Sequence, residues 1–192
     1  MSKKVTGLRM LHAAKLTIEG DKVTFETPFR IPDAEEVTIT DTFTEGQNYA
    51  DNVRNIYIKK LTGADITINV SSLSRKLEAD ITGKAFEKGE MLAKNSDIQP
   101  QIAILYQKTY DDGSYDNIVY YNCKLDKTDE STKTSTDNIE FIGVGLTGKA
   151  APLPTGEVKY VISSDEVGPD DLEMKGKLDN FFKTVQKYGT TE

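Results

Sequence analysis

Two segments of the chain alternate apolar and polar residues with a period of two, and threonine occurs on the polar side of both and dominates it in the first. Residues 36–44 read Glu-Val-Thr-Ile-Thr-Asp-Thr-Phe-Thr, and residues 64–70 read Ala-Asp-Ile-Thr-Ile-Asn-Val. Successive side chains of a strand point to opposite faces, so this pattern indicates strands with one buried and one solvated face. Threonine suits such a surface because it tolerates the pleated backbone and offers water a hydroxyl group. Strands with one wet face are typical of antiparallel sheets.

Other runs of strand type surround these two segments. One pair of runs is joined by Asp111-Asp112-Gly113-Ser114, in which Asp-Gly is a strong hairpin signal. Two long loops are predicted. The first, residues 45–60, separates the two threonine-rich strands, and the second, residues 126–137, contains no apolar residue. The further predicted strands cover residues 8–18, 22–27, 101–108, 116–125, 138–147 and 157–163.

Two helices are expected, over residues 72–82 and 169–187. Ser71 or Ser72 is the expected cap of the first helix, and Gly83 ends it. Pro169 suits the first position of the second helix. The apolar stripe that docks this helix on a core consists of Leu178, Phe181, Phe182 and Val185.

The expected fold is therefore mainly β: an antiparallel β-sandwich or partial barrel with one short flanking helix and one C-terminal helix. The length of 192 residues suits one domain, residues 1–192, with no appended immunoglobulin-like domain. Apolar residues make up only 37% of the chain. A chain this polar either carries large solvated loops or completes its core by pairing with copies of itself.

Charge and composition exclude several partners. The chain has 24 basic and 31 acidic residues, a net charge of −7. Affinity for nucleic acid comes from clustered lysine and arginine, so specific binding of DNA or RNA is not expected, although DNA could still pass an acidic or neutral surface. No stretch approaches the roughly 20 apolar residues of a membrane span, so no membrane partner is expected.

No motif supports catalysis, and we expect no enzyme, cofactor, metal or small-molecule ligand. The segment from Gly143 to Ala150 resembles a phosphate-binding loop, but such loops need a following helix, which Pro152 and Pro154 forbid. We interpret it as a strand whose glycines allow close packing or a bulge. The single histidine, His12, and the single cysteine, Cys123, cannot build a zinc site, and we expect both to be structural.

Six short motifs follow one another along the chain: Thr6-Gly-Leu-Arg-Met-Leu-His-Ala-Ala14, Tyr49-Ala-Asp-Asn52, Asp65-Ile-Thr-Ile-Asn-Val-Ser-Ser-Leu73, Gly113-Ser-Tyr115, Thr147-Gly148 with Pro154 downstream, and Asn180-Phe-Phe182. In this order they resemble the major tail proteins, or tail tube proteins, of long-tailed, non-contractile-tail bacteriophages of Gram-positive bacteria. The resemblance covers nearly the whole chain.

The resemblance implies a virion structural protein of the phage tail, made in the host cytoplasm. Such subunits form hexameric rings that stack into a tube, and strands of each subunit join a continuous barrel around the channel. The implied partners are further copies of the chain, a tape-measure protein, and tail-terminator and baseplate proteins. DNA passes through the lumen without specific binding. Another β-sandwich component of a phage or secretion system, such as a baseplate, adaptor or tail-terminator-like protein, is the alternative.

A wide barrel with an aqueous lumen needs strands with one polar face, and the two alternating segments supply such faces. The polar side chains expected to face the lumen, on an acidic and threonine-rich surface, are Glu36, Thr38, Thr40, Thr42, Asp65, Thr67 and Asn69. The loop over residues 45–60 is expected to reach a neighbouring subunit or ring through Tyr49, Asp51, Arg54 and Tyr57.

Overall fold

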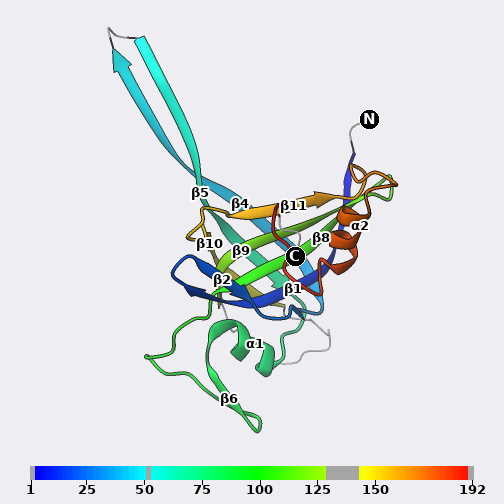
Figure 1. Cartoon of the computed structure of the whole chain (residues 1–192). Coiled ribbons are helices and arrows are strands. Elements are labelled where there is room, and N and C mark those ends of the chain that lie inside the picture. Colours follow the sequence, from blue (N-terminus) through cyan, green and yellow to red (C-terminus); the bar gives the residue numbers. More distant parts are fainter. Residues whose placement is uncertain (1–2, 51–52, 129–142, 190–192) are drawn as a thin grey trace, which may run out of the picture.

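The computed structural model describes residues 3–50, 53–128 and 143–189 (Figure 1). Antiparallel strands make up most of the molecule, which confirms the predicted fold class. The elements in chain order are β1 (Val5–Glu19), β2 (Lys22–Phe25), β3 (Phe29–Arg30), β4 (Ala34–Ala50), β5 (Val53–Val70), α1 (Arg75–Thr82), β6 (Ala85–Glu87), β7 (Glu90–Leu92), β8 (Ile102–Tyr110), β9 (Tyr115–Lys127), β10 (Val144–Ala151), β11 (Lys159–Ser163) and α2 (Leu172–Asn180).

Nine of these strands form one sheet that turns back on itself through β9. The main path of the sheet runs β2-β1-β8-β9-β10-β5-β4. Residues 115–123 of β9 pair with β8, whereas residues 122–127 pair with β10. The long strand therefore belongs to two layers, β1-β8-β9 on one side and β9-β10-β5-β4 on the other. The result is the predicted sandwich, closed along one side as a partial barrel.

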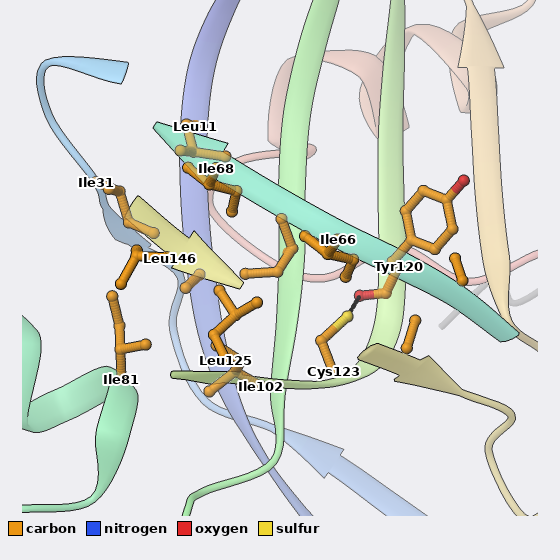
Figure 2. Packing of buried hydrophobic residues seen from close by; sticks show 14 of the residues in the cluster. Leu11, Ile31, Ile66, Ile68, Ile81, Ile102, Tyr120, Cys123, Leu125 and Leu146 are labelled. Carbon is orange, nitrogen blue, oxygen red and sulfur yellow. Dashed lines mark hydrogen bonds between the residues drawn. The ribbon is translucent and has the colours of Figure 1, made fainter. Parts of the chain in front are cut away.

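The main core lies between these two layers (Figure 2). Ile66 and Ile68 of β5 are 1% and 0% exposed, and they meet Ile102 and Ile104 of β8, which are fully buried. Ile81 of α1 closes one end of this core. Burying apolar side chains of this size contributes about 1.5–3 kcal/mol each. The apolar side chains that alternate along residues 64–70 therefore stabilise the contact between the two layers.

A second core covers the outer face of β1, β8 and β9. Tyr121 of β9 is buried there against Phe181, which follows α2 and is fully buried. The predicted stripe of Leu178, Phe182 and Val185 packs on the same cluster. The chain therefore has three layers, with α2 outside the sandwich (Figure 1).

The two helices begin later than predicted. Ser74 caps α1, because its side chain accepts the Leu77 N–H at 3.3 Å, while Ser72 instead donates to Asp33 at 2.8 Å. Gly83 ends the helix in the left-handed conformation, with φ 78°, as predicted. Asp171 caps α2, so Pro169 lies outside the helix.

The second helix also ends earlier than predicted, at Asn180. The Phe181 N–H donates to the Leu178 carbonyl at 3.3 Å, a bond that tightens the last turn. Phe181 then enters the second core.

The prediction of a loop over residues 45–60 is wrong. β4 and β5 continue past the body as a two-stranded ribbon whose register runs from Phe43↔Leu61 to Ala50↔Val53. We call residues 43–50 and 53–61 the arm. It projects from the end of the body opposite α1 and β6 (Figure 1). In the second predicted loop, β9 continues to Lys127, and residues 129–142 lie outside the described residues.

Candidate functional site

The seven residues predicted to line a lumen share one solvent-exposed face of β4 and β5. Thr38 pairs with Thr67, and Thr40 pairs with Asp65, and all four side chains are exposed. The remaining three, Glu36, Asn69 and Thr42, lie on the same face, with Glu36 exposed and the other two half-buried. Asn69 donates from Nδ2 to Glu36 Oε2 at 3.2 Å.

The same polar face continues onto β10 and β9, which the sequence did not indicate. Thr147 of β10 pairs with Thr67 on one side and Asp126 on the other. Lys149 likewise lies between Asp65 and Lys124, and its Nζ is 3.4 Å from Asp65 Oδ1. The sequence signal for this extension is weak, since only Thr147 and Lys149 alternate with apolar residues in β10 and glycines interrupt the pattern.

These additions change the charge expected for this face. On this face the four strands present three acidic residues, Glu36, Asp65 and Asp126, against Lys124 and Lys149. The surface, which we call the polar face of β4-β5-β10-β9, is therefore close to neutral and rich in hydroxyl groups, and not acidic as expected.

The layer that carries the polar face has strand edges without partners in the described part of the chain. β4 stands at the end of the sheet and pairs only with β5. On the opposite side of the layer, residues 124–127 of β9 pair with β10 but not with β8, whose ladder stops at Cys123. Unpaired edges present rows of N–H and C=O groups that another chain can bind.

The arm exposes apolar side chains far from the core. Phe43 and Tyr57 are each 46% exposed, and Ile58 is 61% exposed. Lys59 lies 4.4 Å from the centroid of the Phe43 ring and 3.5 Å from Glu45. A hydrogen bond to Glu45 raises the pKa of Tyr57. These contacts hold the arm together locally but leave much of its apolar surface in water.

The four residues predicted to contact a neighbour fall on or next to this arm. Tyr57 lies on β5, where its side chain is exposed. Tyr49 and Arg54 are cross-strand partners near the tip. Asp51 lies outside the described residues.

The candidate chemical groups sit in structural positions. His12 is buried, its Nδ1 is 2.8 Å from the Met10 carbonyl, and its ring packs against Phe182 with centroids 5.1 Å apart. Burial lowers the pKa of His12, aided by the charge of Arg30. Cys123 is fully buried, and burial raises its pKa to about 12.

The lookalike of a phosphate-binding loop forms β10, and β10 is followed by Pro152. A Cβ atom added at Gly148 would lie 1.9 Å from the Lys124 carbonyl oxygen, so the glycine serves close strand packing, as predicted.

Within the described ranges, no group of three His, Cys, Asp or Glu residues could hold a metal ion. No helix in the same ranges is long and apolar enough to span a membrane.

Comparison with known proteins yields little. No protein-family model matches the chain, and no curated protein matches its sequence. Among solved structures, the chain is similar to the cap of the anti-feeding prophage, a cap that terminates the AFP tube, solved by cryo-EM. The identity is 12%, the match covers 81% of this chain and 89% of that chain, and the TM-score is 0.43. At this level of similarity the relation carries no argument about what the chain does.

Proposed function

We propose that the chain is the building block of a phage tail tube, which polymerises as stacked hexameric rings around a channel for DNA. The observation that carries this proposal is the four-stranded layer β4-β5-β10-β9, which has a core-facing apolar side, a solvent-facing polar side and, within the described residues, unpaired strand edges. In the proposed assembly this layer is a segment of a larger barrel, which copies of the chain close.

Pairing between copies would satisfy both edges. In this arrangement the free edge of β4 in one subunit would pair with residues 124–127 of β9 in the next subunit. The layer would then continue from copy to copy. Closure of a barrel removes exposed edges altogether. With strands about 4.8 Å apart and tilted by roughly 40°, a barrel of about 24 strands from a six-fold ring has a backbone diameter of roughly 48 Å, which leaves an aqueous channel.

The polar face then lines this channel. Its hydroxyl groups and nearly balanced charges, from Asp65 with Lys149 and from Asp126 with Lys124, offer DNA no cluster of cations. Because affinity for DNA depends on lysine and arginine that neutralise phosphates, DNA would pass without being held. The predicted lumen-facing set of β4 and β5 keeps this assignment, extended by Thr147 and Lys149 of β10 and by Lys124 and Asp126 of β9.

The arm is the second contact between copies. An isolated two-stranded hairpin is marginally stable in water, and this one also exposes Phe43 and Ile58. A neighbouring subunit or ring that covers these side chains would stabilise the arm and join the copies. Tape-measure, terminator and baseplate proteins would be the further partners of the finished tail in the virion.

Negative-stain electron microscopy of concentrated protein tests this function. Long tubes of uniform width are the expected result. Single rings that do not stack would favour the alternative of a terminator or adaptor, and a protein that stays monomeric at every concentration would overturn the proposal.

A further inference from the structure

The base of the arm is built differently from the arm and from the body. The pairing register shifts there, from Thr42↔Gly63 to Phe43↔Leu61, which leaves Thr62 as one extra residue on β5. Such a bulge bends a strand and re-aims the residues beyond the bend. Thr62 donates from Oγ1 to the Thr42 carbonyl at 3.1 Å.

The bulge is pressed against the body. A Cβ atom added at Gly63 would lie 2.2 Å from the Ala150 carbonyl oxygen, so only glycine lets β5 approach the end of β10 this closely. The bend therefore lies against a rigid surface, and the body determines the direction in which the arm leaves.

Asp41 precedes the bulge by one residue and is bound from two other strands. Tyr120 of β9 donates its hydroxyl to Asp41 Oδ1 at 2.9 Å, and Lys159 of β11 forms an ion pair with Oδ2. The Lys159 ammonium also lies 5.6 Å from the centroid of the Tyr120 ring. Burial, followed by the hydrogen bond to Asp41, raises the pKa of Tyr120. The Asp41 side chain is 24% exposed, so these contacts are only partly screened by water.

We propose that Asp41 is the positioning residue of the arm: through Tyr120 and Lys159 it holds the bulged base in one direction, and assembly depends on that direction. The link to assembly rests on the proposed function, whereas the restraint on the arm does not.

The length of the arm explains why direction matters. Eight paired positions at about 3.3 Å each make a ribbon of roughly 25 Å. A change of about 10° at its base moves the tip by about 4 Å, close to the spacing of neighbouring strands. A small loosening at Asp41 thus takes the tip out of register with any strand or groove that receives it.

Spin-label distance measurements on the monomer test the restraint directly. One label is placed at Ile58→Cys on the arm and the other at Thr24→Cys on β2, both exposed. The native Cys123 is buried and does not take a label. The Asp41→Asn, Tyr120→Phe and Lys159→Gln variants are compared with the parent, and Asp21→Asn, in the exposed turn between β1 and β2, is the charge-matched control.

The expected result is a narrow distance distribution in the parent and in Asp21→Asn, and a clearly broader one in Asp41→Asn, Tyr120→Phe and Lys159→Gln. Tyr120→Phe removes only the hydroxyl group that binds Asp41 and keeps the ring in the core. This variant therefore tests the restraint even if Asp41→Asn folds poorly. Equal widths in all folded variants would overturn the restraint, whether or not the protein forms tubes.

Polymerisation of the same variants, without labels, tests the link to assembly. We expect Asp41→Asn to need a roughly tenfold higher protein concentration to polymerise, which corresponds to about 1.4 kcal/mol per subunit. A broadened arm with unchanged polymerisation would overturn this link. If the parent itself forms no tubes, the proposed function fails, and the distance distributions alone still decide the role of Asp41.

Discussion

Glu78 is the most heavily compensated charge among the described residues. Its side chain is 3% exposed and is contacted by Arg75 at 3.0 Å, Lys84 at 3.1 Å and Lys127 at 3.7 Å. Burial acts to raise its pKa, but the hydrogen bonds from Lys84 and Arg75 and the charge of Lys127 outweigh burial, so the pKa lies below the ordinary 4.5. Because Lys127 belongs to β9, this cluster ties α1 to the sheet.

We predict that Glu78→Gln lowers the free energy of unfolding by about 2 kcal/mol near pH 7, because charge-assisted hydrogen bonds are lost while the cations remain. A depressed carboxyl pKa stabilises the fold above the unfolded value and loses that effect as pH falls through the folded value. Urea unfolding at several pH values should therefore show the difference between variant and parent shrinking below about pH 4.5. Glu87→Gln, at an 83% exposed side chain, is the control, and an equal loss there would contradict the prediction.

A substitution at Gly148 tests whether the glycine-rich segment serves close strand packing. Because its missing Cβ would collide with the Lys124 carbonyl, Gly148→Ala should force β10 and β9 apart at a cost of about 3 kcal/mol. Thermal unfolding measures this loss. Gly168→Ala, where an added Cβ meets nothing within 4 Å, should change stability little, and a neutral Gly148→Ala would show that the close packing is not required.

At the scale of elements, the arm is the part of the fold that its own contacts explain least. Of its described side chains only Leu61, at the base, packs on the main core, and beyond Leu61 the two strands pair only with each other within the described residues. Its length and its exposed Phe43, Tyr57 and Ile58 are costs for a monomer, which an assembled state would offset.

We therefore predict that replacing residues 46–58 with Asn-Gly leaves a folded monomer that does not form tubes. The short turn suits a two-residue hairpin and keeps the pairing of Glu45 with Lys59. Circular dichroism and thermal unfolding should match the parent, since Tyr57 and Ile58, the removed residues with described side chains, belong to neither core. Tubes of normal length and yield would contradict the role of the arm.

At the scale of the whole molecule, the faces of the sheet differ in burial. Its outer face beneath α2 and its inner face are both buried in cores, whereas the polar face of β4-β5-β10-β9 has no cover within the described residues. A monomer with one wet layer and unpaired edges is consistent with a subunit whose structure is completed by other copies.

The orientation of this face can be measured by accessibility. A cysteine at Thr67, in the middle of the polar face, should react with both small and polymer-linked maleimides in the monomer. In assembled tubes it should still react with the small reagent, which diffuses along the channel, but much more slowly with the bulky one, which the channel excludes. Equal reactivity with the bulky reagent in both states would place Thr67 on the outside of the tube.

The sequence by itself determined the local structure wherever a pattern repeats over short range. Alternation in residues 36–40 and 64–70 determined which side chains of β4 and β5 face the core, whereas Phe43, beyond the register shift, is exposed. Asp-Gly determined the β8–β9 turn, and Gly83 determined the end of α1. The tertiary structure decided the features that depend on distant partners. Asp33 took the hydrogen bonds of Ser71 and Ser72 and left Ser74 as the cap. The pairing of β10 between β5 and β9 brought Lys149 and Lys124 onto the polar face and made it nearly neutral. The arm is a two-stranded ribbon because residues 43–50 pair with residues 53–61 across the hairpin. Pairing between polar residues produces no apolar periodicity in the sequence, so the sequence did not predict these strands.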